Sequence, residues 1–272
     1  MKKVATIILN RNLPKLTDKL YTNLKKNNKI SDFYVLEAGS DYKKLSKNVT
    51  WHVKTKIVRK NGMRFARGMN QALSNLFYEN KFDYDAFFLI TNDTTFEKYN
   101  VIDKLYNVMK KHPKVGILSP CARTWGEFKL LKKTKTMYFP FIHNNAYFLR
   151  KNFIKQIMNQ KKPNKLNFLF DGTNFRGFGV ESEIIAKAYS NDWAAAITSS
   201  VICGHQERYL LKNFEEIKTE DYETNLKLYI DEGLKWMKNK YGFSNKWAMH
   251  MYVKNFYDKF FQYNPELKKF KI

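Results

Sequence analysis

Short apolar runs alternate with amphipathic stretches along the first half of the chain. Each apolar run ends in polar or turn-forming residues, which is typical of strands buried in a parallel sheet. The amphipathic stretches between them have the period of helices that pack on such a sheet. Strands are expected at residues 3–10, 32–41, 50–58, 85–93 and 115–122, and helices at 15–26, 63–79 and 101–113. This alternation predicts an α/β fold with a mainly parallel sheet flanked by helices.

From residue 139 the pattern loosens. A strand ending near residue 148 is followed by expected helices at 151–159 and 179–192 and a last strand at 193–205. Beyond it the chain is expected to be helical, at about 213–242 and 244–263. The tail carries apolar stripes formed by Trp236, Trp247, Tyr252, Phe256 and Phe260. We interpret these stripes as packing on the main domain, although they would also suit a dimer contact.

Length and hydropathy limit the class of protein. A chain of 272 residues with 44% apolar residues fits one large globular domain, or one domain with an appendage. No run of 18 apolar residues occurs, and the first apolar stretch is too short for a signal peptide or a membrane span. Cys121 and Cys203 have no partner at metal-ligand spacing, which is typical of core thiols in a reducing compartment. We therefore expect a soluble, cytoplasmic protein.

The net charge of +24 is concentrated before residue 206. Residues 206–272 hold 13 basic and 10 acidic side chains, which leaves +21 for residues 1–205. Residues 42–78 contain nine basic side chains and no acidic one, and residues 128–170 contain ten and none. Such windows favour a basic face that attracts polyanions. A lysine-rich surface that binds nothing in particular, enriched by the base composition of the genome, is the alternative.

Carboxylate and imidazole side chains follow three of the expected strands. Glu37 follows the second strand, Asp93 the fourth and His205 the last. Because open α/β sheets bind ligands at the carboxyl edge of their strands, we expect these side chains to converge there. Together with phosphate oxygens of a ligand they would suit a divalent cation. Simpler interpretations exist, since Asn92 and Asp93 are turn residues and His205 after Gly204 could just end its strand.

Several motifs occur in an order that resembles one family. They are "IILNRN", "VLEAGSD", "ARGMNQAL" with Gly68 and Asn70, "LITNDTTF", "GVESEIIAK" and the final His205. The set resembles the GT-A glycosyltransferases of family 2, which include rhamnosyltransferase-like proteins, over residues 4–205. The resemblance implies a GT-A (Rossmann-like) domain at 1–205, with a nucleotide-sugar half at about 1–120 and an acceptor half at about 121–205. Residues 206–272 would be a C-terminal helical extension.

The resemblance also implies a donor site for a nucleotide sugar such as UDP-glucose. Its expected residues are Leu9, Asn10, Glu37, Arg64, Arg67, Asn70, Asn92 and Asp93. Glu37 would border the base, and Asp93 would hold Mn²⁺ or Mg²⁺ with His205 as a further metal ligand. Thr91 takes the place of the first acid in the usual motif, so metal binding is expected to be weaker than in the family.

Two acids of the "GVESEIIAK" motif are the candidate catalytic residues. An inverting transfer needs a carboxylate that removes the proton of the acceptor hydroxyl, and we assign this role to Glu181, with Glu183 as a second candidate. In another register of the family pattern Ser182 would take the place of the base. Both acids would also be favoured simply by the dipole at the start of a helix.

A basic and aromatic stretch in the second half suits an acceptor that carries phosphates and bases. Its candidate residues are Arg123, Trp125, Lys129, Lys132 and Lys133. The favoured acceptor is a hydroxymethylated pyrimidine in phage-type DNA, which would have to be flipped out of a duplex. The alternatives are a surface polysaccharide or lipid-linked glycan, and a non-catalytic nucleic-acid-binding protein with a degenerate transferase fold.

Overall fold

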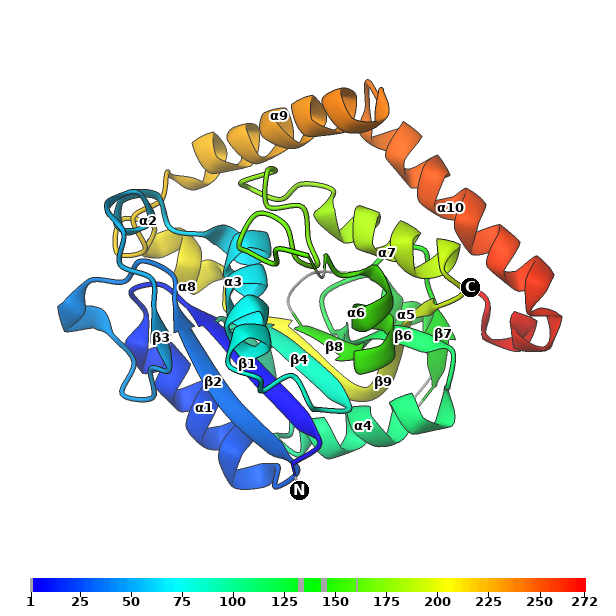
Figure 1. Cartoon of the computed structure of the whole chain (residues 1–272), viewed down its shortest axis with the longest axis horizontal. Coiled ribbons are helices and arrows are strands. Elements are labelled where there is room, and N and C mark those ends of the chain that lie inside the picture. Colours follow the sequence, from blue (N-terminus) through cyan, green and yellow to red (C-terminus); the bar gives the residue numbers. More distant parts are fainter. Residues whose placement is uncertain (1, 132–134, 143–145, 160) are drawn as a thin grey trace.

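The computed structural model describes residues 2–131, 135–142, 146–159 and 161–272 (Figure 1). In these residues nine strands form one sheet. They are β1 (Val4–Asn10), β2 (Ser31–Glu37), β3 (Trp51–His52), β4 (Ala86–Thr91), β5 (Thr94–Phe96), β6 (Val115–Ala122), β7 (Thr136–Tyr138), β8 (Ala146–Arg150) and β9 (Ala194–His205).

The sheet is mixed, with the order β3-β2-β1-β4-β8-β6-β9-β5, and β7 pairs with β9. Strands β1 to β4 are parallel, whereas β8 is antiparallel to both of its neighbours, β4 and β6. Since β9 is parallel to β6, it points in the same direction as β1, β2 and β4. The carboxyl ends of these four strands therefore lie at one edge of the sheet, as the sequence predicts.

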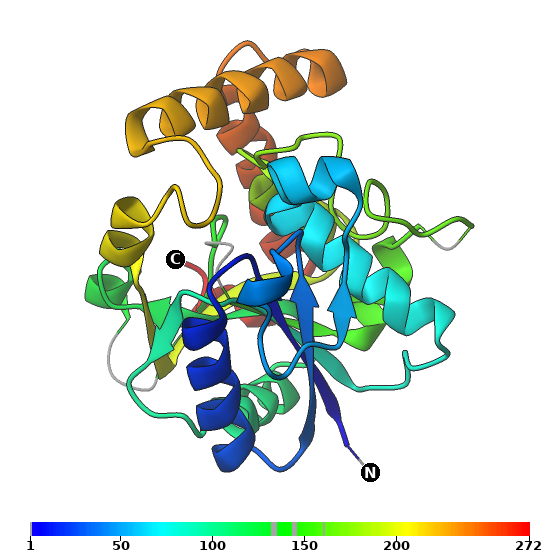
Figure 2. The same ribbon diagram turned by 90° about the vertical axis from the view of Figure 1, so that its left-hand side faces the viewer.

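Helices cover both faces of the sheet (Figure 1). Helices α1 and α4 lie on one face and α3, α6 and α7 on the other, as the side view also shows (Figure 2). The helices are α1 (Pro14–Asn27), α2 (Lys56–Asn61), α3 (Arg64–Tyr78), α4 (Val101–Lys111), α5 (Glu127–Leu130), α6 (Lys151–Ile157), α7 (Val180–Ser190), α8 (Glu207–Lys212), α9 (Tyr222–Tyr241) and α10 (Lys246–Tyr263), with the 3₁₀ turns η1 (Tyr42–Lys44) and η2 (Pro265–Phe270). The predicted α/β class is confirmed.

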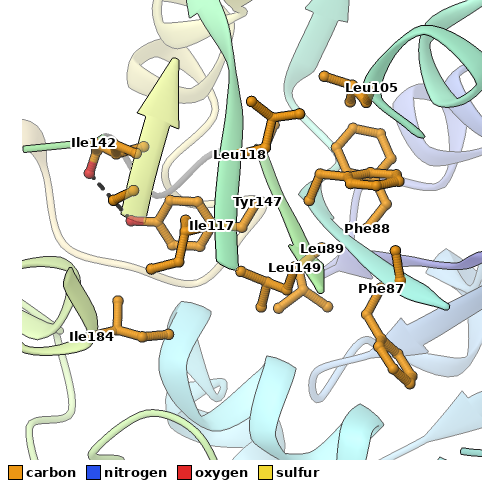
Figure 3. Packing of buried hydrophobic residues seen from close by; sticks show 14 of the residues in the cluster. Phe87, Phe88, Leu89, Leu105, Ile117, Leu118, Ile142, Tyr147, Leu149 and Ile184 are labelled. Carbon is orange, nitrogen blue, oxygen red and sulfur yellow. Dashed lines mark hydrogen bonds between the residues drawn. The ribbon is translucent and has the colours of Figure 1, made fainter. Parts of the chain in front are cut away.

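The core is built on both faces of strand β4. Phe87 and Phe88 are fully buried and point to opposite faces because successive strand residues alternate. Phe88 packs toward Leu105 of α4, while Tyr147 of β8 lies on the other face near Ile184 of α7 (Figure 3). Burying each such side chain stabilises the fold by about 1.5–3 kcal/mol. This core fixes the strand ends from which the site is built.

Two of the expected elements are wrong in their extent. Only Trp51–His52 of the expected strand 50–58 pairs with β2, because β2 itself ends at Glu37. The Thr55 side chain then caps α2, which turns the chain and buries Val58. Similarly, the expected helix from about 213 begins only at Tyr222. Strands β5 and β7 were not expected at all.

The C-terminal helices pack on the main domain. Trp236, Met237 and Met249 form a small core with Phe178, the residue before the glycine that caps α7. Gly233 lets α9 approach closely, since a Cβ there would lie 2.4 Å from the Cβ of Phe178. The predicted packing of the apolar stripes holds for Trp236, Tyr252, Phe256 and Phe260, whereas Trp247 is 65% exposed.

Two further observations concern the rest of the chain. Cys121 and Cys203 are buried free thiols, as predicted, and burial raises the pKa of each to about 12. No helix in the described ranges is both long enough and apolar enough to cross a bilayer.

Candidate active site

A chain of hydrogen bonds runs across the carboxyl ends of β2, β1 and β4. The Asn10 amide donates to both carboxylate oxygens of Glu37, at 3.0 and 2.9 Å, and Asn10 Oδ1 accepts from Asn92 Nδ2 at 2.7 Å. Glu37 is fully buried and also accepts from the Ser46 backbone N–H. This is at odds with the predicted base contact of Glu37. Its carboxylate orders the strand ends instead of facing a ligand.

Asp93 and His205 lie side by side at this edge. Asp93 Oδ2 is 3.7 Å from His205 Nδ1, and both side chains are 13% exposed. They meet because β5 follows Asp93 and pairs antiparallel with β9, opposing Thr94 to His205. Thr91, the residue in place of a second acid, shares a hydrogen bond of 3.1 Å with Thr94.

The Asp93–His205 pair fits a divalent cation with few protein ligands. Neighbouring ligands of an octahedral ion with bonds of ~2.1 Å lie about 3 Å apart, so little movement is needed. Within the described part of the chain no group of three or more His, Cys, Asp and Glu side chains could hold a metal. A cation between Asp93 and His205 would therefore have to take its other ligands from water or from a bound anion.

A cavity of about 170 Å³ opens beside this pair at the ends of β1 and β4. Leu9, Asn10, Asn92 and Asp93, all expected at the donor site, line it, as do Thr91, Arg64 and Arg11. Gly68 lets α3 approach closely, because a Cβ there would meet the Leu9 side chain at 2.5 Å. The structure thus brings most of the predicted donor residues together in one cavity.

Two arginines give this cavity positive charge. Arg11, which the sequence reasoning missed although it stands in the "LNRN" turn, has its pKa lowered to about 10 by burial and by the nearby charge of Arg64. Arg64 adopts a left-handed backbone conformation with φ of 55°, a strain that often marks functional sites. The Nε atoms of both are buried and lack a hydrogen-bond acceptor among the described residues. Two such donors suit an anionic ligand.

A segment after β9, residues 209–220, closes one side of the cavity; we call it the C-terminal strap. Leu210, Ile217 and Thr219 line the cavity. Glu220 binds Arg64 at 3.2 Å and Arg176 at 2.7 Å, and the hydrogen bonds from Arg176 lower its pKa to about 2. Arg64, a predicted donor residue, is therefore held by a carboxylate of the protein itself.

Glu181 lies in the first turn of α7, near the same edge of the sheet. Helix α7 packs on β9, and the charge of Glu181 acts on Tyr147 of β8, which pairs with Leu89, two residues before the end of β4. Burial raises the pKa of Glu181 to about 7. Burial also raises the pKa of Tyr147 and Tyr229, and the charge of Glu181 raises both further. Its Oε2 is enclosed and has no hydrogen-bond partner in the described ranges. A carboxylate in this state is a suitable proton acceptor.

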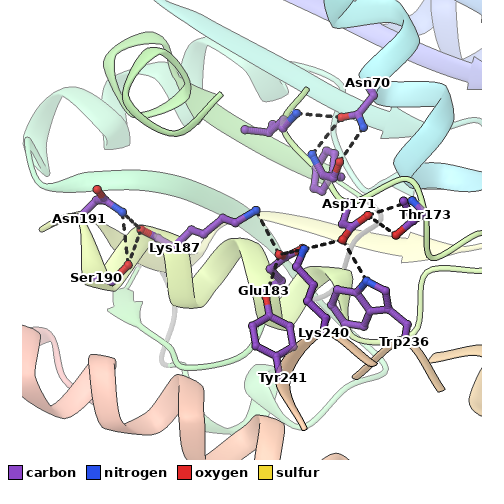
Figure 4. Close-up of polar contacts among 12 residues, drawn as sticks. Asn70, Asp171, Thr173, Glu183, Lys187, Ser190, Asn191, Trp236, Lys240 and Tyr241 are labelled. Atoms are coloured by element: carbon purple, nitrogen blue, oxygen red, sulfur yellow. Dashed lines mark hydrogen bonds and ion pairs between the residues drawn. The ribbon is translucent and has the colours of Figure 1, made fainter. Parts of the chain in front are cut away.

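Glu183 has a different environment, shown in Figure 4. It is 2% exposed, and its Oε1 accepts from Lys240 Nζ at 2.7 Å and Tyr241 Oη at 2.8 Å, both at the end of α9. Lys187 adds an ion pair at 3.2 Å. These contacts are at odds with the catalytic role predicted for Glu183. Its carboxylate fastens α9 to α7.

Two other predicted donor residues hold the loop before α7. Asn70 is fully buried and exchanges hydrogen bonds with the backbone of Lys165, Leu169 and Phe170. Arg67 donates from Nε to the carbonyl of Gly172. The Asn70 side chain is satisfied by the protein, which argues against its predicted direct contact with a nucleotide sugar. Arg67 uses only its Nε–H in a hydrogen bond within the described residues, so its contact with the donor stays a prediction.

One of the predicted acceptor residues, Trp125, lies near His205. The Trp125 ring is 6.2 Å from the His205 ring and is 40% exposed, and Lys129 is exposed nearby on α5. Arg123 is paired with Glu97 and lies over the Phe128 ring. Lys132 and Lys133 lie outside the described residues.

The sequence matches no protein-family model, and no curated protein resembles it significantly. Solved structures do resemble the fold. A mannosyltransferase from Pyrobaculum calidifontis in complex with GDP-Man and Mn²⁺ matches 94% of this chain and 86% of its own, with 12% identity and a TM-score of 0.51. GalNAc-T7 with UDP, GalNAc and Mn²⁺ matches 89% of this chain and 57% of its own, with 10% identity and a TM-score of 0.55.

At these identities the likeness establishes the fold alone. The chain has the GT-A fold, an α/β architecture that it shares with these glycosyltransferases, followed by two long C-terminal helices. The predicted fold is thereby confirmed.

Proposed function

We propose that this protein is a metal-dependent inverting glycosyltransferase that uses a nucleotide-sugar donor, with Glu181 as general base. One observation carries the proposal most: Glu181 has an enclosed Oε2 without a hydrogen-bond partner among the described residues and a pKa of about 7, and it interacts with Tyr147 beside β4, the strand that leads to Asp93. The fold neighbours support it, since both were solved with a nucleotide or nucleotide sugar and Mn²⁺.

The donor would bind with its diphosphate near Arg11 and Arg64, whose buried Nε groups lack acceptors in the described part of the chain. A divalent cation held by Asp93 and His205 would neutralise charge on the diphosphate as it leaves. A UDP-type donor is our first choice, on the resemblance of the motifs, and a GDP-type donor is the natural comparison. The cavity of about 170 Å³ is smaller than typical ligand pockets of ~300–1,000 Å³, so the C-terminal strap would have to move.

The proposed reaction depends on the transfer of the acceptor hydroxyl proton to Glu181. Glu181 Oε2 takes the proton of the acceptor hydroxyl while that oxygen forms a bond to the anomeric carbon of the donor. The bond from this carbon to the diphosphate oxygen breaks, and the nucleoside diphosphate leaves with the electron pair. Attack from the side opposite the diphosphate inverts the anomeric configuration. Arg11 and Arg64 stabilise the charge that develops on the leaving group.

Release of nucleoside diphosphate from UDP- and GDP-sugars, with and without Mn²⁺, tests this function. Wild-type protein should release it in a Mn²⁺-dependent way, and Asp93→Ala should abolish the release. The anomeric configuration of a transferred sugar, read by NMR, tests inversion. No release from any of these donors would leave the alternative of a non-catalytic protein on a transferase fold.

A hydroxymethylated base in DNA is one candidate acceptor, supported by the exposed Trp125 next to His205 and by the exposed Lys129 on α5. Mass spectrometry of hydroxymethylated DNA after incubation with UDP-sugars tests it. The expected result is a mass gain of one sugar on the modified base. A protein that shows no retention on single- or double-stranded DNA at low salt would count against this acceptor.

A further inference from the structure

A second cavity, of about 590 Å³, lies between the loop at residues 171–175 and helix α9. Phe175 and Asn174 line the loop side, and Trp236, Asn239 and Lys240 line the helix side. Its volume is in the range of ~300–1,000 Å³ that is typical of small-molecule sites. No predicted site residue lines it, so the donor site described above does not explain it.

The cavity wall is held together by a partly buried polar cluster. Asp171 Oδ2 accepts from Trp236 Nε1 at 3.0 Å and from Lys240 Nζ (Figure 4). The Asn174 amide bonds to the backbone at Gly177 and Phe178, which fixes the turn before α7. Both sides of the cavity are therefore ordered by hydrogen bonds before any ligand arrives. Such pre-organisation is what a binding site requires.

Contacts connect this cavity to both halves of the proposed active site. The guanidinium of Arg67 lies 4.7 Å from the centre of the Phe175 ring and that of Arg64 lies 5.8 Å from it, and Arg64 also lines the donor cavity. On the other side Lys240 binds Glu183, two residues after Glu181 in the first turn of α7. A molecule in the second cavity would thus lie between the donor wall and the helix that carries the base.

The lining favours a sugar over a polyanion. Phe175 is partly exposed and contributes aromatic surface, to which Trp236 adds little because it is only 8% exposed. Lys235 and Asn239 make no side-chain hydrogen bond or ion pair within the described part of the chain. Aromatic surface with a few polar donors suits the C–H faces and hydroxyls of a pyranose ring. A nucleic-acid backbone, in contrast, would meet the carboxylates of Asp171 and Glu232 in the same cavity.

We propose that this cavity binds a sugar ring of the acceptor, so that the acceptor of this enzyme is a carbohydrate. The inference rests on the proposed glycosyltransferase function and names its acceptor class. Helix α9 of the C-terminal extension then forms one wall of the acceptor site. The hydroxyl to be glycosylated belongs to a neighbouring part of the same carbohydrate, within reach of Glu181.

Saturation-transfer NMR with methyl glycosides of glucose, galactose and mannose at millimolar concentrations tests the binding directly. Wild-type protein should transfer saturation to at least one glycoside. Thr173→Trp, at an exposed position that lines the cavity, should fill it and lose most of that signal, and Asn239→Ala should weaken it. Asn255→Ala, at an exposed position on α10 that does not line the cavity, should leave the signal unchanged. Circular dichroism checks that each variant is folded.

Two results would overturn the inference. One is the absence of signal from every glycoside with folded wild-type protein, and the other is an equal signal from wild type and Thr173→Trp. Donor hydrolysis is measured in parallel and does not need the acceptor. If wild-type protein hydrolyses the donor but binds no glycoside, only the proposed acceptor site is refuted. If wild-type protein does not hydrolyse any donor, the proposed glycosyltransferase function is refuted. Transfer to hydroxymethylated DNA that Thr173→Trp leaves unchanged would identify the acceptor as nucleic acid.

Discussion

His205 Nδ1 lies 3.7 Å from Asp93 Oδ2 because the last strand of the sheet returns beside the short strand that follows Asp93. The two side chains come from distant parts of the sequence and share one position at the edge of the sheet. Their separation is close to that of two ligands of one divalent cation.

The first prediction concerns this pair. His205→Ala should weaken binding of Mn²⁺ in the presence of UDP by about tenfold or more, because it would remove one of the two proposed protein ligands. Electron paramagnetic resonance of free Mn²⁺ measures the affinity. His250→Ala is the control, since His250 packs on Phe141 at the C-terminal helices. Equal affinities in the two variants would show that His205 is not a ligand.

The second prediction concerns catalysis by Glu181. Glu181→Gln keeps the shape of the side chain and removes the base, so transfer should fall by about 10²- to 10⁴-fold while UDP binding is kept. In the wild type the turnover rate should rise with pH through an apparent pKa of about 7, because Glu181 must be ionised to accept the proton. The slope should disappear in the variant. Glu266→Gln, at an exposed position, is the control.

The third prediction concerns stability. Since burial raises the pKa of Glu181 above its ordinary value of 4.5, the folded protein binds this proton more tightly than the unfolded chain. This tighter proton binding stabilises the folded state fully below pH 4.5, and the stabilisation is lost as the pH rises through about 7. Glu181→Gln should therefore raise the melting temperature relative to wild type at pH 8, and by much less at pH 5. A lower melting temperature of the variant at pH 8 would falsify the buried-base assignment.

The residues of the candidate site differ in how far the sequence could predict their environments. The placement of Asp93 and His205 at one edge of the sheet was predictable, because parallel strands share an edge, whereas their close approach depends on β5, which was not expected. Glu183 and Glu37 were misjudged since their environments depend on distant partners, Lys240 in α9 and the Asn10 amide in β1. No local pattern contains such contacts.

Other parts of the structure were missed for the same reason. Arg11 becomes a site residue only because α3 places Arg64 beside it. The C-terminal strap closes the donor cavity through residues that have no periodic signal, and the loop at 171–175 becomes a cavity wall only when α9 lies over it. Strand β5, three residues long, is defined by its partner β9.

The fourth prediction concerns the C-terminal strap. Glu220→Gln removes the charge that holds Arg64 and Arg176, so the strap should open more often. Amide hydrogen exchange at residues 213–220 should be faster, and UDP should associate more rapidly than with wild type, as stopped-flow fluorescence would show. Glu223→Gln, at an exposed position in the first turn of α9, should change neither rate. Unchanged exchange in Glu220→Gln would mean that other contacts keep the strap closed.

The fifth prediction concerns the attachment of α9. Gly233→Ala would place a Cβ 2.4 Å from the Phe178 Cβ and 2.7 Å from its carbonyl oxygen, so α9 must shift. Overpacking of this kind costs about 1–3 kcal/mol, which thermal unfolding can measure. Gly126→Ala meets no atom within 4 Å and should leave the melting temperature nearly unchanged. Equal stability of the two variants would mean that α9 can move away from Phe178 at no cost.

Gly233 lets α9 pack closely on Phe178, and α9 then forms one wall of the second cavity. The first cavity is made by strand ends, the start of α3 and the C-terminal strap, whereas the second cavity takes one wall from α9 alone. Substitutions on the inner face of α9 can thus change what is recognised there without touching Asp93 or Arg11. If the second cavity binds the acceptor as proposed, substitutions in α9 can change acceptor preference while the residues at the strand ends stay the same.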